Sequence, residues 1–209
     1  MDTGIARAWM QAVAASMDKN KDHLTQLDAA IGDGDHGANM SRGFAAVAAA
    51  IGSAAPTTSV GDLLNKVGST LVSTVGGASG PLYGSAFRAI GKELSGPTIS
   101  LAQLAAALTA GLEAIKKLGA AAPGDKTMID AYTPAVAALT AAASRGGGLG
   151  AATAQASAAA EQGAKATTPL QARKGRASYL GPRSAGHQDP GATSTALIFR
   201  ALADVCAGK

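Results

Sequence analysis

Apolar residues recur at intervals of three and four along most of this chain, which is the spacing of one face of an α-helix. The first such face contains Ile5, Trp9, Val13 and Met17 and ends near Asn20. The same spacing predicts further helices around residues 40–51, 60–75, 84–94, 101–118, 128–139 and 197–205, and a short segment with Leu24 and Leu27 precedes residue 28. Residues 149–166 are mostly alanine, a strong helix former, and are also predicted to be helical.

Several helix boundaries are marked by their residue types. Ser100 and Gln103 have the spacing of a capping box, and Gly119 is suited to end the helix that they begin. A polar loop without regular structure is predicted from Thr167 to about Pro190. Loops of this length are uncommon in compact domains and usually have a function.

The predicted fold is a single all-α domain over residues 1–209, with about eight helices. No segment shows the sustained alternation of a β-strand. If successive helices run in opposite directions, four polar turns lie at the same end of the domain. These turns are at residues 28–39, 76–80, 123–127 and 167–190. We therefore expect them to form a single site.

Composition excludes some partners. The net charge is +4, and only 3% of the 209 residues are aromatic, so few side chains could stack on bases and a nucleic-acid partner is not expected. Basic residues are scattered, with one cluster at Arg173, Lys174, Arg176 and Arg183. This cluster either faces phosphate, for which arginine is well suited, or is solvated loop charge.

The sequence indicates a cytoplasmic protein. Cys206 is the single cysteine, so no disulfide can form within the chain, as is usual in a reducing compartment. The first residues lack the basic and apolar regions of a signal peptide. No stretch reaches the roughly 18 apolar residues of a membrane span, so no membrane association is expected.

The most informative stretch is residues 28–39, because Asp28, Asp33 and Asp35 fall within eight residues among helix-breaking glycines. Three unpaired carboxylates at one point would repel each other, and a hard divalent cation such as Mg²⁺ resolves the conflict. An EF-hand is excluded, since its loop ends in a glutamate and none occurs between Asp33 and Glu93. A solvated acidic loop, or Asp35 capping the next helix, remains the alternative.

A second turn contains Gly76–Gly77–Ala78–Ser79–Gly80 and precedes a predicted helix. Backbone N–H groups at such a helix start can hold phosphate, although a plain interhelix turn explains the glycines equally well. Neither a Walker loop nor a Rossmann fingerprint is present. His36 could stack on a base, bind phosphate or cap a helix.

Four motifs together resemble one family. They are LDAAIGDGDHGANM at 27–40, VGGASGPLYG at 75–84, PGDKTM at 123–128, and ARKGRASYLG with GHQDPGA at 172–181 and 186–192. In this order they are similar to the nucleotide-binding L subunits of dihydroxyacetone kinases. The resemblance extends from about residue 5 to the end of the chain.

This resemblance implies a barrel of eight antiparallel helices that holds ADP or ATP at one end through two Mg²⁺ ions. The metal ligands implied are Asp28, Asp33 and Asp35. The residues implied to contact the nucleotide are His36, Gly37, Ala38, Asn39, Ala78, Ser79, Gly119, Met128, Arg176, Asp189, Pro190 and Gly191. Of these, Arg176 is implied to be catalytic as well.

The implied reaction is phosphate transfer to dihydroxyacetone held on a separate K subunit. A free-standing L chain is similar to the phosphotransferase-system type, in which a donor M subunit rephosphorylates the bound nucleotide. Two alternatives stay open. One is an ATP-dependent kinase subunit acting on another ketose or on a carrier-bound acyl group. The other is a non-catalytic helical scaffold that binds a partner or a lipid, which the intact acidic turn disfavours.

Overall fold

The computed structural model describes residues 1–52 and 58–207. Within these ranges it contains nine α-helices, one 3-10 helix and one isolated β-bridge between Asp2 and Thr98. The elements are α1 (Thr3–Lys19), α2 (Lys21–Ile31), α3 (His36–Gly52), α4 (Val60–Thr74), α5 (Ser79–Glu93), α6 (Leu101–Gly119), α7 (Met128–Ser144), α8 (Leu149–Ala166), η1 (Arg176–Ser184) and α9 (Pro190–Cys206). The all-α prediction is confirmed.

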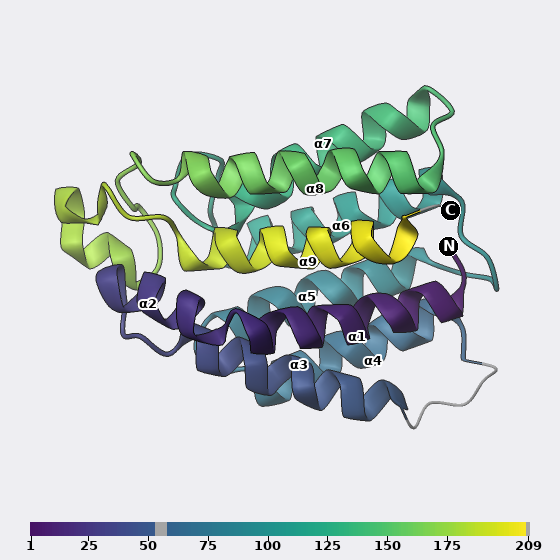
Figure 1. Cartoon of the computed structure of the whole chain (residues 1–209), viewed down its shortest axis with the longest axis horizontal. Helices are drawn as coiled ribbons and strands as arrows, with labels where there is room; N and C mark the ends of the chain where they lie inside the picture. The colour runs from purple at the N-terminus through teal and green to yellow at the C-terminus, as the bar shows by residue number, and fades with distance from the viewer. Residues whose placement is uncertain (53–57, 208–209) are drawn as a thin grey trace.

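Eight of the α-helices close into a ring. From α3 to α9 each helix packs against the next one in the chain, α9 packs against α1, and α1 packs against α3 (Figure 1). The indole N–H of Trp9 donates to the carbonyl oxygen of Ile198 at 3.0 Å across the junction of α1 and α9. The predicted barrel of eight antiparallel helices is therefore present, and α2 is an additional short helix at one end.

The interior of the ring is filled by the apolar faces that the sequence predicts. Trp9 and Phe44 both contact Phe87, with ring centroids 5.8 and 6.3 Å apart respectively. Small residues let the helices approach closely. A Cβ atom on Gly68 would lie 2.6 Å from the carbonyl oxygen of Gly84, so α4 and α5 can be this close only with glycine there.

The alternating helix directions place the four polar turns at one end, as predicted. Figure 1 shows α2 continuing beyond α1 rather than folding back, so the two helices count as one passage along the barrel. The N-termini of α3, α5, α7 and α9 consequently meet at this end. The start of α1 and the end of α9 lie at the opposite end (Figure 1).

Predicted helix boundaries are mostly confirmed, with two corrections. The capping box at Ser100 and Gln103 is formed in both directions. However, α6 runs through Gly119, and the left-handed residue that ends it is Ala120, with φ 46°. A Cβ on Gly119 would lie 3.3 Å from Leu82, so this glycine allows close packing with α5.

The second correction concerns the loop between α8 and α9, which contains the 3-10 element η1 at Arg176–Ser184, kinked at Gly181. A 3-10 helix is short and shows no apolar repeat in the sequence, so periodicity did not reveal it.

Among the described residues, none of the helices combines the length and apolar character needed to cross a membrane.

Candidate functional site

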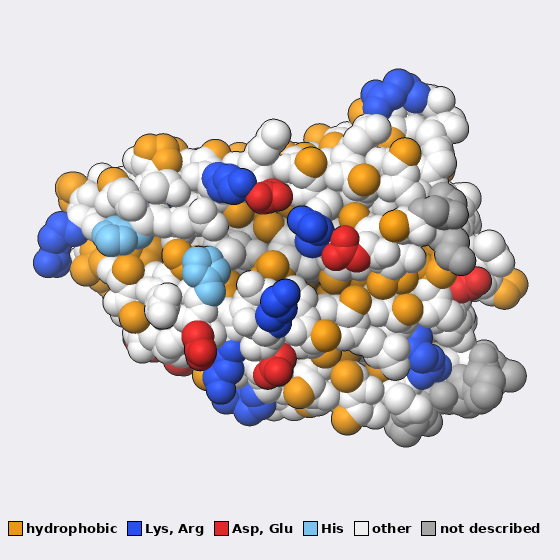
Figure 2. Space-filling model, viewed as in Figure 1, with side chains coloured by type: hydrophobic (Ala, Val, Ile, Leu, Met, Phe, Trp, Pro, Cys, Tyr) orange, Lys and Arg blue, Asp and Glu red, His pale blue; other side chains and the backbone are white. Residues whose placement is uncertain are grey.

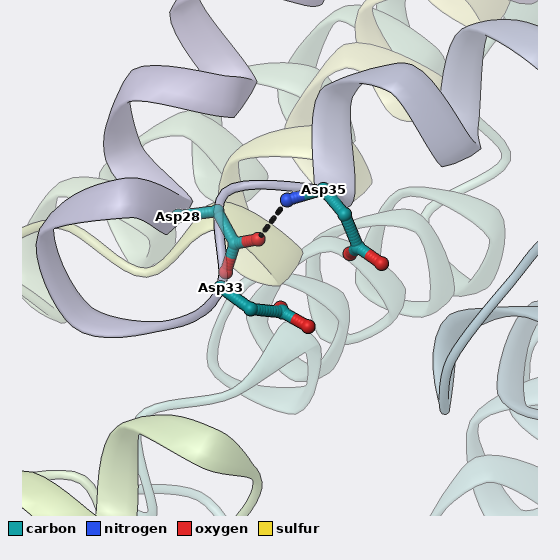
Figure 3. A group of neighbouring side chains, drawn as sticks. All are labelled: Asp28, Asp33 and Asp35. Atoms are coloured by element: carbon teal, nitrogen blue, oxygen red, sulfur yellow. Dashed lines mark hydrogen bonds between the residues drawn. The ribbon is translucent and has the colours of Figure 1, made fainter.

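The acidic turn brings its three carboxylates together. Asp28 lies in the last turn of α2, Asp33 lies in the turn that follows and Asp35 directly precedes α3 (Figure 3). One oxygen from each lies within 4.8 Å of the others. Asp28 is buried, whereas Asp33 and Asp35 are exposed and project toward the same side of the turn (Figure 3). The donor set consists of oxygen alone, which suits a hard divalent cation.

Asp28 is held in place by the start of α3. One of its oxygens accepts the main-chain N–H groups of Asp35 and His36, at 2.9 and 3.0 Å. Asp28, rather than Asp35, therefore satisfies the first donors of this helix. A Cβ on Gly32 would lie 2.1 Å from the other Asp28 oxygen. Glycine at position 32 thus leaves that oxygen accessible to a ligand.

The glycine turn opens α5 without a side-chain cap. Its N-cap residue is Ala78, which offers no hydrogen bond to the free N–H groups of the first turn. These groups and the helix dipole favour an anion. Because α5 begins at the same end as the acidic turn, an anion bound there and a cation bound by the carboxylates would lie in the same cavity.

His36 links the two turns. Its Nδ1 is 3.3 Å from the Ser79 hydroxyl and its Nε2 is 2.9 Å from the Ser194 hydroxyl. Burial lowers the pKa of His36, although Asp28 and Asp35 oppose the shift. This favours a neutral imidazole, which fixes the spacing between the starts of α3 and α5.

The four turns line one cavity of about 460 Å³. This volume is in the range of small-molecule and cofactor sites. Most of the predicted residues line it: Asp28, Asp33, Asp35, His36, Ala78, Ser79, Gly119, Met128, Arg176, Asp189, Pro190 and Gly191.

Three predicted residues do not line the cavity, namely Gly37, Ala38 and Asn39. A Cβ on Gly37 would lie 2.0 Å from the carbonyl oxygen of Lys21, so this glycine serves the contact between α2 and α3. Asn39 is buried, and its side-chain oxygen accepts a hydrogen bond from Arg42 at 2.6 Å. The Asn39 amide lies against Gly76 of the glycine turn, because a Cβ on Gly76 would be 3.0 Å from its oxygen.

Sequence reasoning missed the apolar wall of the cavity and some of its polar residues. The apolar residues are Ile31, Leu82, Ile115, Ala121 and Ile129, and the polar ones include Lys126, Thr127 and Tyr179. All but Ile115 lie within two residues of a predicted motif, and Ile115 lies about one helical turn from the predicted site residue Gly119. This nearness to predicted residues is the signal that would have distinguished these cavity residues from the other apolar residues, which form the core.

Arg176 begins η1, and its guanidinium lies 3.0 Å from the Asp33 carboxylate. Its side chain is 68% exposed, and an ion pair this exposed contributes only about 0–1 kcal/mol. Figure 2 shows Lys and Arg side chains at the tip of the molecule near η1, and charges of both signs along the rest of this face. The Arg176 side chain is thus at the cavity but weakly held.

Asp189 caps α9 by accepting the main-chain N–H of Ala192 at 2.7 Å. Burial raises the pKa of its carboxyl to about 7; Asp130 and Asp28 add to the shift, while the Ala192 N–H and Lys126 oppose it. The folded state therefore binds this proton more tightly than the unfolded chain. The stability that this group contributes is present below about pH 4 and is lost as the pH rises to about 7.

We expect Asp189→Asn, which keeps a capping oxygen, to lose less stability than the wild type between pH 4 and 7. The difference should be on the order of 2–4 kcal/mol. Urea unfolding without divalent cations measures it, with Asp204→Asn as a control at an exposed aspartate on the same helix. Parallel stability curves for the wild type and Asp189→Asn would mean that Asp189 is ionised throughout.

The groups that line the cavity are carboxylate oxygens suited to a divalent cation, main-chain amides suited to an anion, and an arginine beside both. An apolar wall adjoins these polar groups. This combination suits a polyphosphate that carries an apolar or aromatic group and is bound together with a cation. The class of protein is thus an all-α barrel with a phosphate-type site at one end.

Comparisons with known proteins give the family. The chain matches the DAK2 domain over residues 30–204. It is 42% identical over 201 residues to the ADP-binding subunit DhaL of PEP-dependent dihydroxyacetone kinase 1 of Listeria innocua, covering 96% of both chains. It is also 42% identical over 196 residues to the ADP-binding subunit DhaL of the PEP-dependent dihydroxyacetone kinase of Escherichia coli, covering 93% of both.

A solved structure has the same fold. The dihydroxyacetone kinase from C. freundii, crystallised with AMP-PNP and Mg²⁺, superposes with a TM-score of 0.72 at 29% identity. The match covers 98% of this chain and 34% of that kinase, so the chain spans about a third of its length. The chain belongs to the DAK2 domain family, and the family resemblance predicted from its motifs is confirmed.

Proposed function

We propose that this chain is the ADP-binding subunit of a dihydroxyacetone kinase. The observation that carries the proposal is the convergence of three carboxylates and the uncapped start of α5 on one cavity of nucleotide size. The names of the relatives, which are ADP-binding subunits of such kinases, support the same activity.

In this proposal the residues divide into three groups. Asp28, Asp33 and Asp35 hold two Mg²⁺ ions, which neutralise the phosphates when bound. The first amides of α5, with Ala78 and Ser79, hold the phosphates, and His36 keeps Ser79 in position. Gly119 and Met128 flank the base, and Asp189, Pro190 and Gly191 close the cavity beside Met128. Arg176 stabilises the charge that develops on the transferred group.

The acceptor in this proposal is dihydroxyacetone on a separate K subunit, which docks at the cavity end because transfer requires contact there. The acid–base group for the sugar then comes from the partner. A donor M subunit of a phosphotransferase system is proposed to restore ATP from the bound ADP. PEP-dependence in the names of the two relatives reported above supports this donor.

We expect the purified protein to retain ADP through gel filtration in Mg²⁺ and to release it in chelator. The reason is that carboxylates and phosphates bind each other only through the cation. Mass spectrometry of the released nucleotide gives its identity. Protein that never carries or binds a nucleotide would contradict the proposal and would favour the non-catalytic scaffold.

A labelled-nucleotide chase then distinguishes a subunit that keeps its nucleotide bound from a subunit that consumes ATP. During turnover with donor and K subunits, a nucleotide used as a prosthetic group stays bound over many cycles. Exchange of the label once per cycle would instead identify a subunit that consumes ATP, and its acceptor could then be another ketose or a carrier-bound acyl group.

A further inference from the structure

The loop that carries Arg176 is joined at its base. The main-chain N–H of Gly186 donates to the carbonyl oxygen of Thr168 at 2.8 Å. The N–H of Asp189 donates to the Thr167 hydroxyl at 2.9 Å. The beginning and end of the loop, residues 167–189, therefore lie side by side where they leave α8 and enter α9.

Lys126 reaches into this junction from the turn between α6 and α7. Its ammonium donates to the carbonyl oxygens of Thr167 at 2.8 Å, Leu170 at 3.1 Å and Thr168 at 3.4 Å, all at the beginning of the loop. It also donates to the carbonyl oxygen of His187 at the end of the loop. One side chain thus connects both ends of the loop to a turn that lies outside it.

The neighbouring main chain extends the same attachment. The N–H of Arg173 donates to the carbonyl oxygen of Asp125 at 3.0 Å, three residues before Arg176. The turn at residues 123–127 therefore contacts the loop at three places: its beginning, its end and the approach to η1. These contacts fix where η1, and with it the Arg176 guanidinium, lies relative to the cavity.

Lys126 occupies an unfavourable position. The residue is 1% exposed, and its backbone has φ 62°, a conformation that non-glycine residues rarely adopt. Burial lowers the pKa of Lys126, although Asp189 and Asp130 oppose the shift. A buried ammonium and a left-handed backbone each cost free energy, and such costs concentrate at functional sites.

Direct phosphate binding by Lys126 is disfavoured by its contacts. An ammonium has three N–H donors, and here four carbonyl oxygens already share them. Although Lys126 borders the cavity, its donors point to the loop rather than to the cavity. Its structural role is therefore distinct from that of a phosphate-binding lysine.

We propose that Lys126 is a positioning residue that holds the 167–189 loop in place so that Arg176 lies over the cavity. The part of this inference that concerns phosphate transfer rests on the proposed function. The part that concerns the loop rests on the hydrogen bonds alone. The two parts are tested by separate measurements.

The first test is amide hydrogen exchange of Lys126→Met, which keeps most of the length of the side chain but has no N–H donors. Exchange in residues 168–187 should become about 10- to 100-fold faster, the factor for losing one hydrogen bond to a charged group. Exchange in α4 and α5 should not change. Lys165→Met is the matched control, because Lys165 is exposed and pairs only with Glu161 on its own helix among the contacts of the described chain. Unchanged loop exchange in Lys126→Met would overturn the proposal.

The second test is a double-mutant cycle with Arg176→Ala on the rate of phosphate transfer. If Lys126 acts by positioning Arg176, Lys126→Met should slow transfer about tenfold or more when Arg176 is present. It should slow transfer little in the Arg176→Ala background. Independent, additive losses would show that Lys126 acts in another way. A chain that transfers no phosphate in any form would contradict the proposed function, while loop exchange would still decide the role of Lys126.

Circular dichroism checks that Lys126→Met is folded. If it is not, Lys126→Arg keeps the charge and the donors, and should fold with a smaller increase in loop exchange. If neither variant folds, Lys126 supports the barrel itself rather than the loop, and the proposal is overturned.

Discussion

Asp33→Ala and Asp35→Ala will each abolish Mg²⁺-dependent ADP binding while leaving the protein folded. Both side chains are exposed at the cavity, and each supplies an oxygen within 4.8 Å of the other carboxylates. Loss of groups that merely orient metal ligands already lowers metal affinity about 10- to 100-fold. Loss of a ligand itself should therefore lower ADP affinity more than about 100-fold, as measured by calorimetry in Mg²⁺.

The stability of the folded protein should not decrease, because removing one of three neighbouring negative charges relieves their repulsion. The helical signal in circular dichroism should equal that of the wild type. Asp204→Ala is a suitable control, since Asp204 is exposed near the other end of the barrel and pairs with Arg200. Asp28 is unsuitable for this test, because its carboxylate also accepts the first N–H groups of α3. Wild-type ADP affinity in both cavity variants would contradict the assignment of Asp33 and Asp35 as metal ligands.

Arg176→Ala will lower the rate of phosphate transfer by a factor of about 10³ or more, the scale for an arginine that stabilises such a transition state. ADP affinity should change far less. The Arg176 side chain is 68% exposed and pairs with Asp33, so the contact that holds it is weak. Binding of a cation by Asp33 would release the guanidinium toward the phosphates at little cost.

Transfer is measured by single-turnover kinetics with the K subunit, and ADP affinity by calorimetry. Arg183→Ala is the matched control, because Arg183 is an exposed arginine near the other end of η1. It should leave both quantities near the wild-type values. Equal losses of binding and transfer in Arg176→Ala would identify Arg176 as an anchor for the bound nucleotide rather than a residue of the transfer step.

The helices could be predicted from the sequence because their signals are local. The four-residue spacing from Ile5 to Met17 and the pair Ser100 and Gln103 each act within one or two turns of the chain. Both are present in the structure as predicted. The grouping of the four polar turns also followed from the sequence, because alternating helices return every second turn to the same end.

Other features required the tertiary structure. Asn39 belongs to a motif but does not line the cavity, because its side chain lies against Gly76 of the next polar turn. Left-handed Ala120 and the 3-10 helix η1 had no periodic signal in the sequence. The pairing of Arg176 with Asp33 joins residues that are far apart in the chain.

By itself the sequence determined the helical class, the clustering of Asp28, Asp33 and Asp35, and the four turns that build the site. These depend on neighbours along the chain or on the simple alternation of helices. Only the tertiary structure decided which motif residues face the cavity and how Lys126 connects with the loop. Those contacts join segments about 40 to 60 residues apart, and their geometry depends on the packing of the closed ring rather than on local residue preferences.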